Sequence, residues 1–359
     1  MRLVFLWLSL SSSWGNGHAT TYRSLLKGLS AAGHDVLFLE RDQPWYSSNR
    51  DLPCPGFCDM QIYGSIAELS RFEATVAAAD AVIVGSYVPD GPAVIEWVNN
   101  HRRGLLCFYD IDTPVTLHGL ADDTVAYVTR DIIPLFDLYL SFTGGPTLRV
   151  LEDVYGARRA VPLYCSVDPA LYHPENAPNN WDLGYLGTYS PDRQPVLDRL
   201  LLEPARRLPR KRFVVAGPQY PATIEWPRNV ERIEHVPPAE HSRFYSSLNW
   251  TLNVTRRDMV RRGYSPSVRL FEATACGVPV MSDRWEGIED VLIPGSSVLL
   301  LDSAAEVVRA MELPDEQRKE IGRAGRAMTL RNHTGRHRAD QLISYLVGAR
   351  DGWRDGRRA

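Results

Sequence analysis

The stretch GYSPSVRLFEATACGVPVMSD, residues 263–283, predicts a short buried helix that runs directly into a buried strand. Between residues 268 and 275 the side chains are small or apolar on most sides, which is typical of a helix packed against a sheet. Gly277 suits the left-handed position after the last helical turn, and Pro279 prevents the helix from continuing. The apolar run 278–281 then predicts a buried strand.

The start of this helix has the features of an anion-binding site. Ser265 is a candidate cap, Pro266 suits the first helical position, and Ser267 offers a second hydroxyl to the free N–H groups. Unpaired N–H groups and the positive end of the helix dipole attract an anion, and Arg269 would stand beside it. Glu272 lies about 1.5 turns along, since a turn takes roughly 3.6 residues, where it would accept hydrogen bonds from two vicinal hydroxyls. This pattern indicates the diphosphate and ribose of a nucleotide; a capped helix with a surface Arg–Glu pair is the alternative.

Composition describes an ordinary globular protein. The 359 residues are enough for two domains of roughly 100–200 residues each, with 44% hydrophobic and 23% charged residues. The net charge of −3 gives no reason to expect general nucleic-acid binding. Five cysteines without a disulfide-like spacing favour a reducing cytoplasm. The first apolar run leads straight into a glycine loop, so we interpret it as a buried strand, and no segment has the ~20 apolar residues of a membrane span.

Both halves of the chain alternate short apolar runs with helical patterns, which predicts a parallel sheet covered on both faces in each half. The Pro- and Asn-rich segment 165–181 is the expected boundary. We therefore predict an α/β fold of two doubly wound, Rossmann-like domains, residues 1–168 and 180–335, facing a central cleft. Residues 336–359 are expected to form a C-terminal helix and an Arg-rich tail.

The loop SSWGNGHAT, residues 12–20, follows the first predicted strand. Its glycines let the backbone approach a ligand closely, and its histidine suits a polar contact better than a helix start. Gly15-x-Gly17-x-x-Thr20 is also an incomplete dinucleotide fingerprint, with Glu40 where a ribose acid would lie, so an NAD-dependent oxidoreductase stays an alternative. The ligand-facing residues expected in this loop are Gly15, Asn16, Gly17 and His18.

Acidic and basic groups follow three other predicted strands. Asp110 and Asp112 alternate along FYDIDTP, so both can act on a divalent metal or on sugar hydroxyls; a turn start at Asp112 is the plain alternative. In the second half, GYLGTYSPDR ends a strand and NVTRRDMVRRG follows the next one. Their candidate phosphate-side residues are Gly187, Thr188, Arg193, Asn253 and Arg256.

These motifs together resemble the GT-B-fold glycosyltransferases, especially retaining enzymes with a "glycosyl transferases group 1" C-terminal domain. The more specific resemblance is to the CgeB-like, spore-maturation-protein-like branch, and it extends from about residue 1 to 345. The glycine loop with its following helix and strand, FYDID, GYLGTYSPDR and GYSPSVRLFEATACGVPVMSD occur in the expected order. The last motif is the most specific.

The resemblance implies a role for each matching residue. Glu272 would hold the ribose hydroxyls, and Arg193 would neutralise the leaving phosphate. The helix start would hold the diphosphate through Ser265, Pro266, Ser267, Val268 and the neighbouring Arg269. The base would meet His235, Val236 and Pro237. Relatives usually carry two glutamates with seven residues between them, and here Tyr264 stands in the first position.

The expected reaction is transfer of a sugar from a nucleotide-diphosphate sugar, by default a UDP-sugar, to a hydroxyl or similar acceptor whose identity stays open. We expect retention by front-side attack without a metal or other cofactor, with Asp110, Asp112, His18 and Arg193 as catalytic candidates. Inversion would make one of the two aspartates the general base. A nucleotide-sugar epimerase or hydrolase of the same fold is the nearest alternative.

Overall fold

The computed structural model describes residues 1–356, with side chains described up to residue 351, and divides into two compact units. Unit 1 contains Met1–Ser166 and the segment that begins at Thr334, and unit 2 contains Val167–His333. Each unit is an α/β domain with a parallel sheet, which confirms the expected fold class. The end of the predicted Arg-rich tail, residues 357–359, lies outside the described residues. No helix within the described residues is long and apolar enough to cross a membrane.

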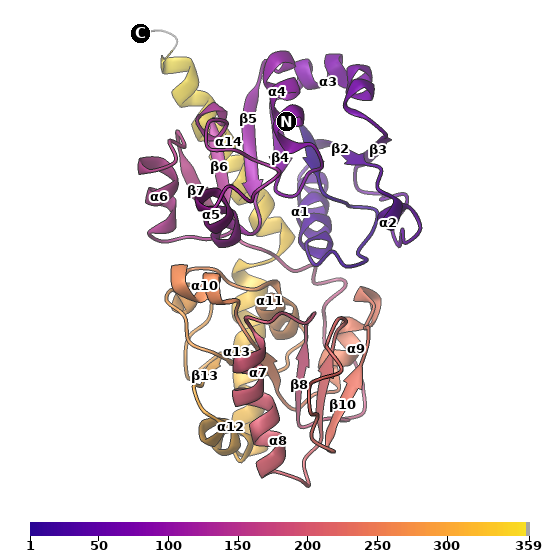
Figure 1. Ribbon diagram of the computed structural model, residues 1–359, viewed down its shortest axis with the longest axis vertical. Helices are drawn as coiled ribbons and strands as arrows, with labels where there is room; N and C mark the ends of the chain where they lie inside the picture. Colours follow the sequence, from indigo (N-terminus) through magenta and orange to yellow (C-terminus); the bar gives the residue numbers. More distant parts are fainter. Residues whose placement is uncertain (357–359) are drawn as a thin grey trace. The chain divides into compact units, whose positions relative to one another are not determined.

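Within the described residues, unit 1 has a seven-stranded parallel sheet of order β3-β2-β1-β4-β5-β6-β7 (Figure 1). The order of the strands reverses at β1, because β2 and β3 lie on one side of it and β4 to β7 lie on the other. The carboxyl end of β1 is therefore a topological switch point, where α/β folds bind ligands. The strands are β1 (Arg2–Trp7), β2 (Asp35–Arg41), β3 (Asp59–Tyr63), β4 (Ala81–Gly85), β5 (Leu105–Asp110), β6 (Leu138–Ser141) and β7 (Ala160–Pro162). The helices are α1 (Ala19–Ala31), α2 (Pro44–Ser47), α3 (Glu73–Ala78), α4 (Gly91–His101), α5 (Thr113–Ala121), α6 (Thr147–Asp153) and α14 (Gly335–Gly356), with short 3-10 turns at Ile66–Phe72 and Ile133–Leu135.

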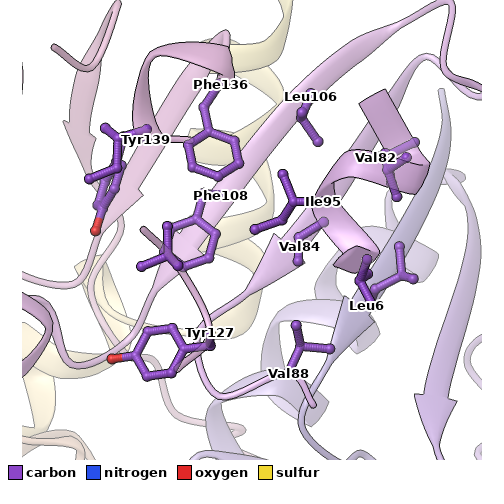
Figure 2. Packing of buried hydrophobic residues seen from close by; sticks show 14 of the residues in the cluster. Leu6, Val82, Val84, Val88, Ile95, Leu106, Phe108, Tyr127, Phe136 and Tyr139 are labelled. Carbon is purple, nitrogen blue, oxygen red and sulfur yellow. The ribbon is translucent and has the colours of Figure 1, made fainter. Parts of the chain in front are cut away.

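The core of unit 1 lies between its sheet and the helices that cover it. Figure 2 shows aromatic rings from β5 and β6 packed beside aliphatic side chains of β4 and α4. Phe108 and Phe136 stack with ring centroids 5.0 Å apart, and both are fully buried. The strands can be apolar along their whole length because both faces of the sheet are covered.

The C-terminal helix α14 belongs to unit 1 and packs against α1. A Cβ on Gly28 would lie 2.3 Å from the carbonyl oxygen of Gly335, and one on Gly335 would lie 2.0 Å from the carbonyl oxygen of Ser24. Both positions therefore require glycine, because any larger residue would force the two backbones apart.

Unit 2 has a six-stranded parallel sheet of order β10-β9-β8-β11-β12-β13, counted over the part of the chain that is described. Its strands are β8 (Leu183–Leu186), β9 (Phe213–Ala216), β10 (Val230–Ile233), β11 (Thr251–Asn253), β12 (Val280–Ser282) and β13 (Leu299–Leu300). Its helices are α7 (Gln194–Leu197), continued by a π-helical turn at Asp198–Leu202 into α8 (Glu203–Arg207), then α9 (His241–Ser246), α10 (Arg257–Arg262), α11 (Val268–Ala275), α12 (Ala304–Met311) and α13 (Asp315–Asn332). Short 3-10 turns lie at Pro238–Glu240 and Ile288–Asp290.

The helix expected in the stretch 263–283 is α11, and it begins two residues later than Pro266. Ser267 is the cap, with its hydroxyl accepting from the amide of Arg269 at 3.3 Å, whereas the hydroxyl of Ser265 donates to the carbonyl oxygen of Gly263. The expectation that Ser265 caps the helix was therefore wrong. The physical reason lies in the preceding turn, because Gly263 and Tyr264 both have positive φ values and delay the helix.

Candidate functional site

The loop between β1 and α1 presents open backbone at the carboxyl end of the unit 1 sheet. Gly15 has a φ of +59°, and a Cβ on either Gly15 or Gly17 would meet no atom within 4 Å. Asn16 is buried and fixes the loop: its amide nitrogen donates to the carbonyl oxygens of Ser9 and Ser12, and its side-chain oxygen accepts from the amide of His18. The loop is a fixed scaffold with an accessible backbone, as a close ligand contact requires.

Glu40 anchors the first part of the same loop from the end of β2. Its carboxylate is fully buried and accepts from the amides of Leu10 and Ser11 at 2.8 and 2.9 Å. The hydroxyls of Ser9 and Ser11 donate to its other oxygen. Glu40 therefore does not lie where it would bind the ribose of a dinucleotide, and this corrects the oxidoreductase interpretation of the position.

His18 and Asp112 meet beside this loop. His18 precedes α1 without forming a side-chain cap, and its Nε2 lies 3.4 Å from Oδ2 of Asp112. The hydroxyl of Tyr87 donates to the same oxygen at 2.9 Å, from a backbone with a φ of +64°. A non-glycine residue in this region of φ is uncommon and often marks a functional site. An imidazole and a carboxylate in contact form an arrangement that can orient a hydroxyl and accept its proton.

Asp110, at the end of β5, has a different environment from Asp112. It is fully buried, and its oxygens accept from the hydroxyls of Tyr139 at 2.6 Å and Thr116 at 2.7 Å. Burial raises the pKa of Asp110 to about 6, although these two hydrogen bonds oppose the shift. Asp112 has 9% of its surface exposed, so it is the aspartate placed to touch a ligand, while Asp110 supports it from within the domain. The two carboxylates do not share one exposed face as the alternation of FYDIDTP suggested.

In unit 2, the side chain of Arg269 connects the start of α11 with the ends of two strands. This arginine is 7% exposed, and its guanidinium donates to the carbonyl oxygen of Leu186 at 2.5 Å and to the side-chain oxygen of Asn253 at 3.2 Å. The guanidinium also lies over the ring of Tyr185, 4.8 Å from its centroid. Arg269 and Asn253 thus hold β8, β11 and α11 together. This structural role was not predicted from the sequence.

The predicted phosphate-side residues Gly187 and Thr188 directly follow β8. A Cβ on Gly187 would lie 2.6 Å from Nη2 of Arg269, and one on Gly217 would lie 2.1 Å from the carbonyl oxygen of Gly187. The side chain of Arg193 turns back onto the carbonyl oxygen of Thr188 at 2.8 Å. The backbone at Gly187 and Gly217 is therefore closely packed, and the guanidinium of Arg193 lies beside this loop.

The loop after β11 carries Arg256 and contacts two aspartates from neighbouring loops, Asp192 and Asp283. Arg256 is half-exposed, with Nε 4.0 Å from Oδ2 of Asp192. Asp283, which the sequence did not single out, is buried and accepts from the amide and hydroxyl of Thr255. Burial raises the pKa of Asp283 to about 6. These contacts fix the loop that carries Arg256.

Glu272 lies on α11, is 5% exposed, and contacts a chain of polar groups that sequence reasoning missed. Burial raises the pKa of the Tyr172 hydroxyl, and the neighbouring Glu272 carboxylate adds to the shift through its charge and as a hydrogen-bond acceptor; the same hydroxyl lies 3.1 Å from Nδ1 of His241. Nε2 of His241 lies 3.0 Å from the carbonyl oxygen of Val236, in the segment predicted to meet the base. His235 and Pro237, on either side, are exposed. Tyr172, Glu272 and the segment 236–241 are far apart in the sequence, so no spacing connected them.

Tyr264, at the position where the resemblance implies a glutamate, has a φ of +48°. Its amide donates to the carbonyl oxygen of Glu286, and its hydroxyl lies 3.4 Å from a carboxylate oxygen of the same residue. A Cβ on Gly287 would lie 2.3 Å from the ring of Tyr264, so the ring packs directly on glycine backbone. The turn before α11 is fixed by these contacts with the loop after β12.

No group of three or more His, Cys, Asp and Glu residues with a metal-holding arrangement occurs in the part of the chain that the structure describes.

Comparison with known structures identifies the fold. Sucrose-phosphate synthase from Thermosynechococcus elongatus superposes with a TM-score of 0.71 at 15% identity, over 97% of this chain and 100% of that one. The chain has the GT-B fold. Anabaena HepE in complex with UDP and glucose gives 0.70 at 14% identity, over 97% and 100% of the two chains. An α-glucosyltransferase bound to UDP-glucose and DNA with an abasic site gives 0.71 at 12% identity, over 96% and 99%.

Sequence comparison adds a match within the second half of this GT-B chain. Residues 193–344, less than half of the chain, match the family model described as "Glycosyl transferase-like". No protein with a curated description is significantly similar in sequence.

Proposed function

We propose that the protein is a glycosyltransferase that moves a sugar from a nucleotide-diphosphate sugar, with a UDP-sugar as donor, to a hydroxyl or similar acceptor. The observation that carries the proposal is the position of Glu272, a buried carboxylate just beyond the capped start of α11. Helix N-termini bind phosphates, and a carboxylate can accept two hydrogen bonds from a vicinal diol. The glycosyl transferase-like match and the UDP or UDP-glucose in two of the similar structures support the same donor.

The chemistry follows from the charge that develops during transfer. As the bond between sugar and diphosphate breaks, negative charge grows on the diphosphate, where N–H groups of the α11 start and Arg193 would stabilise it. Charge stabilisation of this kind needs no metal, so we propose a metal-independent reaction. Loss of turnover on addition of a chelator, with recovery on addition of Mg²⁺ or Mn²⁺, would contradict this part.

We further propose retention of the anomeric configuration, with the departing phosphate accepting the acceptor's proton. In that reaction Asp112 and His18 orient the acceptor hydroxyl. If the reaction inverts, the same pair supplies the general base, and its contact across 3.4 Å suits that task. The anomeric-proton NMR spectrum of the product separates the two outcomes, and an inverted product would overturn retention.

Two narrower assignments accompany the proposal. The order of motifs favours the CgeB-like branch, and the five cysteines, all free, suit a cytoplasmic protein. Neither the family branch nor the state of the cysteines indicates the class of acceptor.

The proposal is tested by the rise in melting temperature on adding UDP, UDP-glucose and other nucleotide sugars. A ligand at 100 times its Kd stabilises the folded protein by about 2.7 kcal/mol. Glu272→Gln keeps the size of the side chain but removes its charge, so it should lose most of the shift and most of the turnover. Glu312→Gln, at an exposed glutamate of the same unit, is the matched control and should keep both. Unchanged donor binding and turnover in Glu272→Gln would sink the proposal, and sugar isomerised without acceptor would indicate an epimerase.

A further inference from the structure

We propose that Tyr172 and His241 are positioning residues for nucleotide binding, which hold the Glu272 carboxylate and connect it to the base-side segment at Val236. The inference rests on the proposed function of Glu272 and deepens it, because it identifies how ribose recognition is held in place. It starts from the continuous chain of polar contacts from Glu272 through Tyr172 and His241 to the carbonyl oxygen of Val236.

Tyr172 is fixed by the backbone on both sides of it. The hydroxyl of Ser242, on α9, donates to the carbonyl oxygen of Leu171 at 2.6 Å and accepts from the amide of His173 at 3.1 Å. Two residues further on, the amide of Glu175 donates to the hydroxyl of Ser246 at 2.9 Å. Tyr172 is itself only 1% exposed. The backbone on both sides of Tyr172 is therefore fixed to α9, and burial of the ring restricts the position of its hydroxyl.

The hydrogen-bond donors and acceptors in this series of contacts determine which partner the Tyr172 hydroxyl can serve. The carbonyl of Val236 can only accept, so Nε2 of His241 carries a proton, and Nδ1 of the neutral ring is an acceptor. Glu272 is also an acceptor, so the single proton of Tyr172 faces two acceptors. Burial lowers the pKa of His241 and keeps the ring in this neutral form.

The Tyr172 proton can be donated either to Glu272 or to Nδ1 of His241. This choice suits a site in which Glu272 must also accept hydrogen bonds from a diol. Without nucleotide, the Tyr172 hydroxyl donates to Glu272 and holds the carboxylate in position. When ribose hydroxyls donate to Glu272, the same proton turns to Nδ1 of His241, so that no buried acceptor is left unpaired. Leaving a buried polar group unpaired is costly; without nucleotide that cost falls on Nδ1 of His241, and donation by the ribose hydroxyls to Glu272 removes it.

A matched control lies one helical turn away from His241. Tyr245 is fully buried on α9, its ring lies 6.4 Å from that of His241, and its hydroxyl has no hydrogen-bond partner among the described residues. Removal of its hydroxyl tests general loosening of the same region without touching the chain of contacts.

The test is calorimetric titration of UDP and 2′-deoxy-UDP into the full-length protein. Preference for UDP over the deoxy compound reports the contact between the carboxylate and the ribose hydroxyls, and a merely structural role would not change that ratio. Tyr172→Phe should lower the preference about tenfold, the loss expected for one hydrogen bond to a charged group. His241→Phe should lower it too and also reduce the preference for UDP over ADP. Tyr245→Phe should change neither ratio, and melting temperatures confirm that each variant is folded.

The outcomes separate this inference from the proposed function. If Glu272→Gln abolishes the preference for UDP over 2′-deoxy-UDP but Tyr172→Phe keeps it, the ribose site stands and the positioning role is overturned. An equal loss of preference in Tyr245→Phe and Tyr172→Phe also overturns it, because general loosening then explains both. If Glu272→Gln itself keeps the preference, the proposed ribose site fails and the positioning role fails with it.

Discussion

Nε2 of His18 lies 3.4 Å from Oδ2 of Asp112, so the loop after β1 and the end of β5 place an imidazole and a carboxylate in contact. This contact lies beside open glycine backbone at the switch point of the unit 1 sheet. The donor-binding candidates are on unit 2, so the pair can be tested independently of donor binding.

Replacement of Asp112 by Asn should slow transfer while donor binding stays the same. The substitution keeps the side-chain volume but removes the charge that orients His18, and loss of a group that handles a proton typically costs 10²–10⁴-fold in rate, so we expect about 100-fold. Turnover is measured as release of UDP, and the donor Kd by titration. Tyr87→Phe, which removes one hydrogen bond to the same oxygen, is the control and should cost about tenfold at most. Full turnover in the Asp112 variant would show that the pair has no part in transfer.

Asp110 should make the stability of unit 1 depend on pH. Its pKa is raised by burial from 3.8 to about 6, so the folded form binds a proton more readily than the unfolded form. The contribution of Asp110 to stability is therefore most favourable below about pH 4 and declines as the pH rises to about 6. Above that pH it stays constant.

The substitution Asp110→Asn should remove this dependence. Relative to the wild type, the variant's free energy of unfolding should rise as the pH increases from about 4 to 6, by roughly 3 kcal/mol at most, since one pKa unit corresponds to about 1.4 kcal/mol. Denaturant unfolding at a series of pH values measures the difference. Asp283→Asn, which removes the other aspartate with a pKa raised to about 6, should act on unit 2 in the same direction. A pH-independent difference for Asp110→Asn would mean that this carboxyl does not titrate in the window.

Much of the fold was predictable because buried parallel strands leave a strong signal. β1, β4 and β5 are covered on both faces, so their sequences are apolar apart from Arg2 at the start of β1 and Asp110 at the end of β5. The edge strands β3 and β10 leave a weaker signal, since half-exposed strands such as DMQIY and VERI alternate polar with apolar residues over only a few positions. Short edge strands have too few residues for a periodic pattern to stand out.

The candidate site was predictable only where neighbouring residues in the sequence act together. The start of α11 is such a case, because the helix, its serine-rich start and the buried Glu272 lie within one short stretch, although the cap is Ser267 and not Ser265. The role of Glu40 was misjudged because its partners are backbone amides of a loop that folds back onto it. Tyr172 and His241 were missed for a similar reason, since only the fold brings them to Glu272.

Arg269 should matter for the stability of unit 2 at least as much as for binding. Replacement by Lys removes the planar fork that serves the carbonyl oxygen of Leu186 and the side chain of Asn253 together. Each buried acceptor left unpaired costs about 1–3 kcal/mol, so we expect a loss of about 3 kcal/mol in the free energy of unfolding. Arg261→Lys, at an exposed arginine paired with Asp258, should change stability by less than about 0.5 kcal/mol. Urea unfolding of both variants checks this, and equal stability would contradict the structural role.

Glu40 should stabilise the loop that carries His18 without any direct part in nucleotide binding. Glu40→Ala leaves the amides of Leu10 and Ser11 without their buried acceptor, so the loop should loosen and the protein should lose about 2–6 kcal/mol of stability, at 1–3 kcal/mol for each unpaired donor. Turnover, measured as release of UDP, should slow because the loop no longer holds His18 in position. The Kd for UDP should stay within about twofold of the wild-type value. Faster cleavage within residues 8–18 in limited proteolysis would report the loosening directly. The oxidoreductase interpretation predicts instead that wild-type protein binds NADH, seen as enhanced nicotinamide fluorescence, and that Glu40→Ala abolishes this signal. Such a result would return Glu40 to the role of a ribose acid.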